Sequence, residues 1–561
     1  MTRNAHDAGR KAPELIALLV ALIAAGCYLA LPSSRHNPDG LRVFPGLRRV
    51  TVDTVGAVSF VPDGWSAGYQ APRYERANTQ KHFLFPLYGF VGYRIARGFG
   101  YRGNGLKPLQ VANAISAALA AGLFALLVGL LVGSPWTVLA AGFGLAFSAA
   151  FSSMATSIAE VVPALPWLML ALILLATDEN LRPGRTACAG FLLGTSAAFY
   201  FVSAAVGAAF ALYLALRRTP RRALLLAGAM LSTTAAIYVL VLLLAGYHTL
   251  PRLGHALFFM PEQGTYGGFK LSNLVSVGLG FAGSLFPVLP DNFGGLRSLL
   301  GQASTGRGLL LAVVTPLVIL LAGALFVALF RTRRQLAVNA RRIVGLGLVL
   351  FAGALVVSLV WDPYHLKLWT YSNIGLWLMI AGYLAHESRT RQTSPTGLTF
   401  WRPTFIALVL LCVVPTNLAH RKADAGGNPK WQAAQAVAAI VNAQPGSIVL
   451  GGWEDEFDYL ALLVPESNQV SLPDVIMELD RDSTRFAGFA TRTLSSARDR
   501  GGSVFFLNLF NRGPVELEAF YVRRLRFPEF ITWLESLRPQ AQETWSDPET
   551  GVHLYRLAAG R

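Results

Sequence analysis

Acidic and basic side chains lie beside apolar runs at several points of the chain. Asp39 shortly follows the first run, Lys81 and His82 begin an aromatic stretch, and Glu160 interrupts an apolar region. The stretch 361–371, WDPYHLKLWTY, combines a carboxylate, an imidazole, an ammonium and four aromatic rings. A positioned carboxylate can remove a proton from a hydroxyl, and cationic side chains bind phosphate. Together these residue types could support group transfer involving a phosphate.

Each position also has a simpler explanation. Asp39 belongs to an Asn-Pro-Asp-Gly sequence, which is typical of a turn at a helix exit. Glu160 could be a helix-end residue that reaches toward water, although a carboxylate at the edge of the hydrocarbon region is costly. An aromatic belt at a membrane surface explains the Trp and Tyr residues of 361–371. It does not require Lys367 and His365 there, so a phosphate-binding cation remains a hypothesis.

Composition places these residues in a membrane protein. The chain has 561 residues, of which 53% are hydrophobic and 14% are charged. Soluble domains carry about 25% charged residues, so a wholly soluble protein is excluded. Apolar runs long enough to form spanning helices occur at 15–31, 109–132, 136–152, 158–176, 186–216, 222–246, 308–330, 343–361, 366–385 and 403–419. The run 186–216 is too long for one untilted span, so we expect two short helices meeting near Tyr200.

Basic loops predict the orientation of the spans. Arginines cluster at 217–222, 331–342 and 389–402, and short loops rich in Lys and Arg face the cytoplasm. All three loops are cytoplasmic only if the weaker segments 82–99 and 271–290 lie in the interface or re-enter. The prediction is therefore 11 spans, with the N-terminus in the cytoplasm and the C-terminus outside.

The N-terminal region admits two interpretations. A signal peptide could explain residues 15–31, but the absence of an A-x-A site and the many later spans favour an uncleaved anchor. The loop 32–108 is then external. Its many arginines do not contradict this, because the preference of basic loops for the cytoplasm applies to short loops only. Within it, 82–99 alternates aromatic or apolar residues with basic ones, which predicts an interfacial amphipathic helix that could hold an anionic head group.

The composition becomes less apolar after residue 419. Strands are predicted at 447–453, 504–509 and 552–556, with helical spacing between them. Residues 420–561 are therefore expected to form a soluble α/β domain outside the cytoplasm, following the transmembrane domain 1–419. The acidic sequence 454–456 could bind a metal, but a solvated turn after a strand is the expected explanation.

Assembled, these features resemble the GT-C superfamily of integral-membrane glycosyltransferases. The resemblance rests on the early acidic Asp39 in a long outer loop, the aromatic-proline segment 82–88, the Gly-rich hairpin 190–200 and the terminal soluble domain. It is strongest to bacterial relatives of protein mannosyltransferases and lipid A aminoarabinose transferases. The resemblance implies a multi-span α-helical fold. It also implies inverting transfer of a sugar from a polyprenyl-phosphate carrier to an extracytoplasmic lipid, glycan or protein.

The resemblance also implies roles for individual residues. Asp39 would be the catalytic base or the carboxylate that orients the acceptor, and Glu160 a second acidic residue of the outer cavity. The donor phosphate would be bound by Lys367 with His365, and by Lys81 and His82. No cofactor is implied with certainty. A divalent metal remains possible, although the early acidic residue is single where many relatives have a pair.

The implied partners are a lipid-linked sugar, an extracytoplasmic acceptor and the bilayer of the bacterial inner membrane. The formal net charge of +17 fits lipid phosphate better than nucleic acid in so apolar a chain. Two alternatives stay open: a transporter or flippase for a lipid-linked saccharide, and a non-catalytic envelope assembly protein. A transporter would place ionisable residues deep within spans, and the predicted spans contain almost none.

Overall fold

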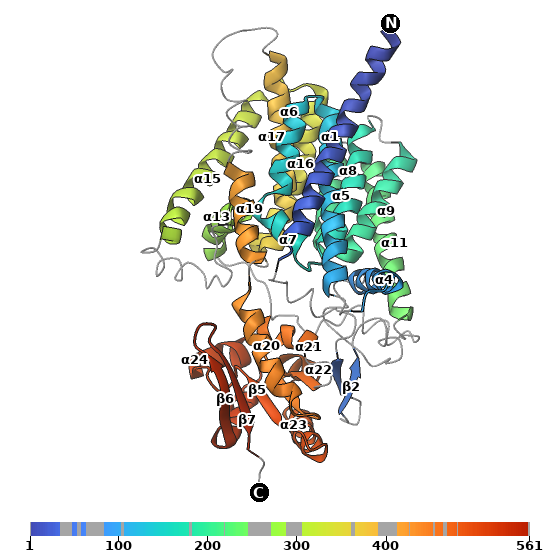
Figure 1. The fold of residues 1–561 in the computed structure, drawn as a ribbon. Helices are drawn as coiled ribbons and strands as arrows, with labels where there is room; N and C mark the ends of the chain where they lie inside the picture. Colours follow the sequence, from blue (N-terminus) through green and yellow to red (C-terminus); the bar gives the residue numbers. More distant parts are fainter. Residues whose placement is uncertain are drawn as a thin grey trace. The chain divides into compact units, whose positions relative to one another are not determined.

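A computed structural model of the chain shows a predominantly helical protein (Figure 1). The residues that it describes are 2–33, 48–52, 58–62, 84–102, 106–178, 182–217, 219–244, 271–287, 306–360, 365–390, 412–425, 427–452, 455–463, 468–479 and 481–558.

The chain forms two compact units. The first comprises Met1–Ser33, Gln110–Ile237 and Gly267–Ala425, and the second comprises Ser34–Leu109, Tyr238–Tyr266 and Gly426–Arg561. The last segment of the second unit begins six residues after the boundary expected from composition. The division into domains 1–419 and 420–561 stays a prediction.

The first unit is a bundle of apolar helices. It is built mainly from α1 (Thr2–Ala30), α5 (Leu106–Val132), α6 (Pro135–Ala146), α7 (Ala149–Thr156), the 3₁₀ turn η2 (Val162–Ala164), α8 (Leu165–Thr177), α9 (Pro183–Phe199), α10 (Val202–Leu216), α11 (Pro220–Leu244), α13 (Ser272–Leu285), α15 (Gly306–Thr332), α16 (Val338–Val360), α17 (Leu366–Thr390) and α19 (Val414–Ala425). Among the described residues, five helices are long and apolar enough to cross a membrane, or six if the bent pair α6 and α7 is one span. The count of 11 spans therefore stays a prediction.

Two apolar runs are interrupted in the structure. Helix α9 ends at Phe199 and α10 begins at Val202, with Tyr200 extended between them (φ −149°, ψ 115°), which confirms the predicted break. The run 136–152, which was predicted to be one span, is broken into α6 and α7 by a 60° bend, a geometry that fits either one broken span or a re-entrant loop. Ser148 is extended there, and its hydroxyl donates to the carbonyl of Leu145. A serine that bonds to nearby backbone offers an alternative to the helical ladder.

Helix α17 lies at the centre of the bundle. It packs against α6, α7, α13 and α16, and its Trp369 and Tyr371 are fully buried. Gly347 of α16 and Gly375 of α17 face each other. A Cβ atom built on either glycine would lie 2.5 Å from the carbonyl oxygen of the other. The two backbones can approach this closely because neither residue has a side chain.

The second unit contains α4 (Leu84–Gly98) and the antiparallel hairpin of β1 (Arg48–Val52) and β2 (Val58–Pro62). The helix expected over 82–99 is therefore present, and Val91 and Ile95 within it and Phe99 directly after its end are exposed. This i, i+4, i+8 spacing forms one apolar stripe on the helix surface. Its location at a membrane surface stays a prediction.

Residues 427–558 form a five-stranded sheet with order β4-β3-β5-β7-β6, in which β3 is parallel to β4 and β5, and β7 is antiparallel to β5 and β6. The elements, in chain order, are α20 (Pro429–Asn442), β3 (Ile448–Gly451), α21 (Asp455–Leu463), β4 (Asn468–Ser471), α22 (Leu472–Glu478), α23 (Ser483–Asp499), β5 (Val504–Leu507), α24 (Pro514–Leu517), the π-helix η4 (Glu518–Arg524), α25 (Glu529–Leu537), the 3₁₀ turn η5 (Arg538–Gln540), β6 (Ala541–Asp547) and β7 (Val552–Leu557). Aromatic residues from the sheet and its helices, including Phe486, Phe506 and Phe530, form the core.

The expectation of a solvated acidic turn after β3 was wrong for Glu456. This residue is 5% exposed, and its Oε1 lies 3.2 Å from Lys430 Nζ. Glu456 lies in the first turn of α21, which packs against α20, the helix that carries Lys430.

Candidate active site

The bundle contains a buried ion pair that joins two of the residues singled out in the sequence. Lys367 Nζ lies 2.7 Å from Glu160 Oε1, and the two side chains are 8% and 1% exposed. Removing two charges from water costs several kcal/mol per ion, so such a pair persists only with close geometry and further polar partners. The pair is therefore an organised feature of the bundle.

A non-helical segment positions Glu160. It lies between α7 and η2, where the chain leaves helical geometry at Ser157. The side-chain amide of Asn113, in α5, donates to the carbonyls of Ser157 and Ala159, both at 3.1 Å. Buried carbonyls outside regular structure need such donors. Asn113 therefore holds the backbone that carries Glu160.

The same segment is tied to the end of α1. The backbone N–H of Ser33 donates to the carbonyl of Thr156 at 3.0 Å. The amide of Gln110, also in α5, donates to the carbonyl of Ser33 at 2.8 Å and to that of Thr156 at 3.3 Å. The chain that leads from α1 toward Asp39 thus starts within the hydrogen-bond network that supports Glu160.

Lys367 is the second residue of α17. His365 precedes the helix, is half-buried, and accepts the N–H of Leu368 on its backbone carbonyl at 3.0 Å. The centroid of the Tyr200 ring lies 5.9 Å from Lys367 Nζ. The same ring stacks on that of Tyr371, with 6.1 Å between the two centroids. An ammonium within about 6 Å of an aromatic face gains a cation–π interaction. Glu160 and Tyr200 thus both stabilise the charge of Lys367.

A chain of hydroxyl groups supports the tyrosines. Tyr371 Oη lies 2.6 Å from Ser203 Oγ, which lies 2.8 Å from Ser196 Oγ. Ser196 Oγ is 2.9 Å from the carbonyl oxygen of Ala164. A hydroxyl has one proton to donate. When Ser196 donates to Ala164, Ser203 therefore donates to Ser196 and Tyr371 to Ser203. This chain fixes the break between α9 and α10 against α17.

The structure does not describe the remaining predicted site residues. Asp39, Lys81 and His82 lie outside the described residues, and their roles stay predictions. Among the residues that the structure describes, no three His, Cys, Asp or Glu side chains gather as ligands for a metal ion. Of the residues predicted for catalysis and for phosphate binding, the structure thus brings Glu160 and Lys367 into contact.

Comparison with solved structures identifies proteins of similar fold. No protein-family model and no curated protein matches the sequence. The crystal structure of ArnT from Cupriavidus metallidurans bound to undecaprenyl phosphate matches with a TM-score of 0.52 at 13% identity, over 97% of this chain and 98% of that one. The chain has the fold of ArnT. The resemblance to GT-C enzymes is thereby confirmed as a likeness of fold.

Two further structures are similar. ArnT in the apo state gives a TM-score of 0.47 at 13% identity, covering 97% of this chain and 98% of that one. The Archaeoglobus fulgidus oligosaccharyltransferase in complex with zinc and sulfate gives 0.43 at 12% identity, covering 96% of this chain and 72% of that one. The ArnT fold and the apolar helices together indicate an integral membrane protein.

Sequence analysis missed several residues around the pair. Asn113 and Gln110 are the two side-chain amides of the long apolar run 109–132, and a polar residue in such a run is itself a signal. Tyr200 was noted as a helix break but not as part of a site. Tyr371 was noted only as one of the aromatic residues of 361–371, and nothing in the sequence singles out Ser203, because the roles of both depend on the packing of α17 against the break.

Proposed function

We propose that the chain is a glycosyltransferase that moves a sugar from a polyprenyl-phosphate carrier to an extracytoplasmic acceptor. The observation that carries the proposal is the buried pair of Glu160 and Lys367 in a bundle with the ArnT fold. The similar ArnT structure contains undecaprenyl phosphate. A protein that takes a lipid-linked donor from the membrane needs a cation at the depth where the phosphate of that lipid lies. We assign this role to Lys367.

The proposed reaction is an inverting displacement. The carboxylate of Asp39 removes the proton of the acceptor hydroxyl as the hydroxyl oxygen forms a bond to the anomeric carbon. The bond between that carbon and the carrier phosphate breaks, and the carrier leaves as a lipid phosphate. Lys367 and His365, with Lys81 and His82, stabilise the negative charge that develops on the departing phosphate. Glu160 positions the ammonium of Lys367.

Orientation follows from the basic loops. Arginines at the end of α10 and at the start of α16 lie at one end of the bundle, which fits the prediction that the loops 217–222 and 331–342 share the cytoplasmic side. Lys367 lies where α17 follows α16, at the opposite end. The pair then faces the outer side of a bacterial inner membrane, with the C-terminal domain in the periplasm.

The distribution of buried charge favours an enzyme over a transporter. Among the described residues of the bundle, the buried Asp, Glu, Lys and Arg side chains are Glu160, Asp178, Lys367 and Arg421. The first three lie at or beyond the ends of helices, and Arg421 lies in the second half of the short helix α19. A transport pathway would instead place ionisable groups midway along the spans.

Binding of undecaprenyl phosphate to the purified protein in detergent tests the donor site. Lys367→Ala should weaken binding about 10- to 150-fold, since a hydrogen bond to a charged group contributes about 1.5–3 kcal/mol, and Lys367→Arg should recover part of the loss. The exposed Lys422 of α19 provides the control, and Lys422→Ala should bind as the wild type does. Equal affinity of the Lys367→Ala and wild-type proteins would contradict the role.

Transfer itself is tested by mass spectrometry of envelope lipids and glycans from cells with and without the chain. A sugar-modified species should require the wild-type chain. Asp39→Asn should reduce its formation by roughly 10²–10⁴-fold, the usual contribution of a positioned base, at matched expression. No difference in any envelope glycan or lipid between the strains would refute the proposed function.

A further inference from the structure

A second charged site lies at the opposite end of the bundle from the ion pair. A cavity of about 80 Å³ opens among the end of α8, the end of α10 and the start of α16. A water molecule needs roughly 10–15 Å³ on this measure, so the cavity can admit a group of several heavy atoms. Helix α8 has 13 residues and is therefore about 20 Å long. The cavity is thus separated from the ion pair by the length of that helix.

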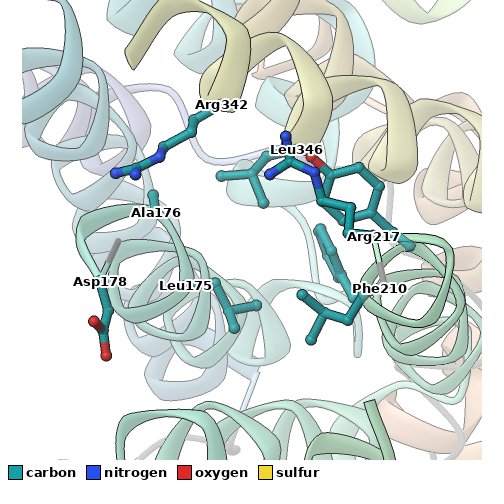
Figure 2. A pocket seen from close by; sticks show the side chains of 9 residues that line it. Leu175, Ala176, Asp178, Phe210, Arg217, Arg342 and Leu346 are labelled. Atoms are coloured by element: carbon teal, nitrogen blue, oxygen red, sulfur yellow. The ribbon is translucent and has the colours of Figure 1, made fainter. Parts of the chain in front are cut away.

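Two arginines line one edge of the cavity. Arg217 follows the last turn of α10, and Arg342 lies in the first turns of α16 (Figure 2). The Arg217 guanidinium also lies 5.2 Å from the ring of Tyr213. Guanidinium groups present several donors in a fixed fork and bind phosphate oxygens in pairs. Two such groups from different helices therefore form an edge suited to a phosphate.

The opposite side of the cavity is apolar. Leu175 and Phe210 lie across from the guanidinium groups in Figure 2, whereas Leu346 lies between the two arginines. A site for a soluble anion would not require such a wall. A ligand with a charged group joined to a hydrocarbon part would contact both sides.

One acidic residue, Asp178, also lines the cavity. Its Oδ2 accepts the backbone N–H of Arg182 at 2.7 Å, and its carboxylate points away from the guanidinium of Arg342 in Figure 2. The charged side chains of the lining are thus two arginines and one aspartate, which leaves one net positive charge. This balance favours a singly charged phosphodiester over a more highly charged anion.

We propose that this cavity binds the phosphate of an anionic phospholipid, such as phosphatidylglycerol, from the cytoplasmic leaflet. The arginine edge holds the phosphodiester, and the apolar wall contacts the glycerol and the first carbons of the acyl chains. Basic pockets between helices on the cytoplasmic side of a membrane are suited to such head groups. The location follows from the basic loops, and it does not depend on the reaction proposed above.

Native mass spectrometry of the full-length protein in detergent tests the proposal. The probes are phosphatidylglycerol, phosphatidylcholine with the same acyl chains, and glycerol 3-phosphate as the soluble phosphate. The wild type should retain phosphatidylglycerol in preference to the other two. The double variant Arg217→Gln/Arg342→Gln should weaken this binding roughly tenfold or more, because it removes charge-assisted hydrogen bonds.

A second double variant provides the matched control. Arg333 and Arg334 are exposed in the loop between α15 and α16 and do not line the cavity. Arg333→Gln/Arg334→Gln removes the same charge and should leave phosphatidylglycerol binding unchanged. If the cavity double variant does not fold, Arg217→Gln alone is the test. Arg217 is exposed, and this single change should still weaken binding several-fold.

Three outcomes would overturn the proposal. Equal weakening by both double variants would show a diffuse attraction to positive charge. Equal retention of phosphatidylcholine would show that the apolar wall alone selects the ligand. Arginine-dependent binding of glycerol 3-phosphate without binding of phosphatidylglycerol would assign the site to a soluble phosphate.

Discussion

A double-mutant cycle on the buried ion pair tests its contribution to stability. At 2.7 Å and an effective dielectric constant of about 20, the attraction between Lys367 and Glu160 is about 6 kcal/mol. Desolvation of the two ions costs several kcal/mol each, so the net contribution of the pair is small. Removing one partner is different, because it leaves the other charge buried without its counter-ion.

The single variants should therefore be more damaging than the double variant. Lys367→Met should lower the free energy of unfolding by about 3–5 kcal/mol, since it leaves a buried carboxylate unpaired. Glu160→Gln should cost less, about 1.5–3 kcal/mol, because the amide oxygen can still accept from the ammonium. The double variant has no buried charge at this position and should be more stable than the sum of the two losses predicts, by about 2 kcal/mol.

Unfolding in mixed detergent micelles, followed by tryptophan fluorescence, provides the four free energies. A cycle with Glu160→Gln and Lys422→Met serves as the control and should be additive. Additivity within about 0.5 kcal/mol for Glu160 and Lys367 would refute the reasoning, because it would show that the two charges do not stabilise each other in the folded protein.

Three further predictions concern packing, backbone support and pH. Asn113→Ala should lower the melting temperature, since two buried carbonyls lose their donor at a cost of about 1–3 kcal/mol. Gly347→Ala should cost about 1–3 kcal/mol through overpacking, whereas Gly323→Ala, which has open space around its Cβ position, should be neutral or slightly stabilising in the same melting assay. A hydrogen bond with Ser546 is the largest cause of the lowered pKa of Glu543. The ionised Glu543 therefore stabilises the folded protein above the ordinary pKa of 4.5. This stabilisation is lost as the pH falls through the lower pKa of the folded state. The protection factors of the β6–β7 amides, which correct for the intrinsic exchange rate at each pH, should therefore decrease in acid, and less so in Glu543→Gln.

Helix positions follow closely from the apolar runs. The run 109–132 corresponds to α5, and the over-long run 186–216 was correctly divided near Tyr200 because its length exceeds one span. The bend between α6 and α7 was missed. Its cause is a serine in an otherwise apolar run, and local hydrogen bonding by one hydroxyl changes hydropathy very little.

The candidate site was only partly predictable. Glu160 and Lys367 were both singled out, because a charged residue next to a span is costly and therefore notable. Their direct pairing across 207 residues could not be read from spacing, since it depends on how α17 packs against the segment after α7. The strands at β3, β5 and β7 were expected from their β-branched and aromatic residues. The neighbour relations within the sheet depend on contacts distant in sequence.

The separation of the two charged partners along the chain also has a consequence for biosynthesis. Glu160 is translated 207 residues before Lys367. At about 5–20 residues per second, the carboxylate waits roughly 10–40 s for its counter-ion. During that interval the carboxylate must be either hydrated or protonated, because an unpaired charge in the bilayer is costly. The arrival of α17 then allows the charged carboxylate to be buried, and the ion pair marks a late step in the maturation of the bundle.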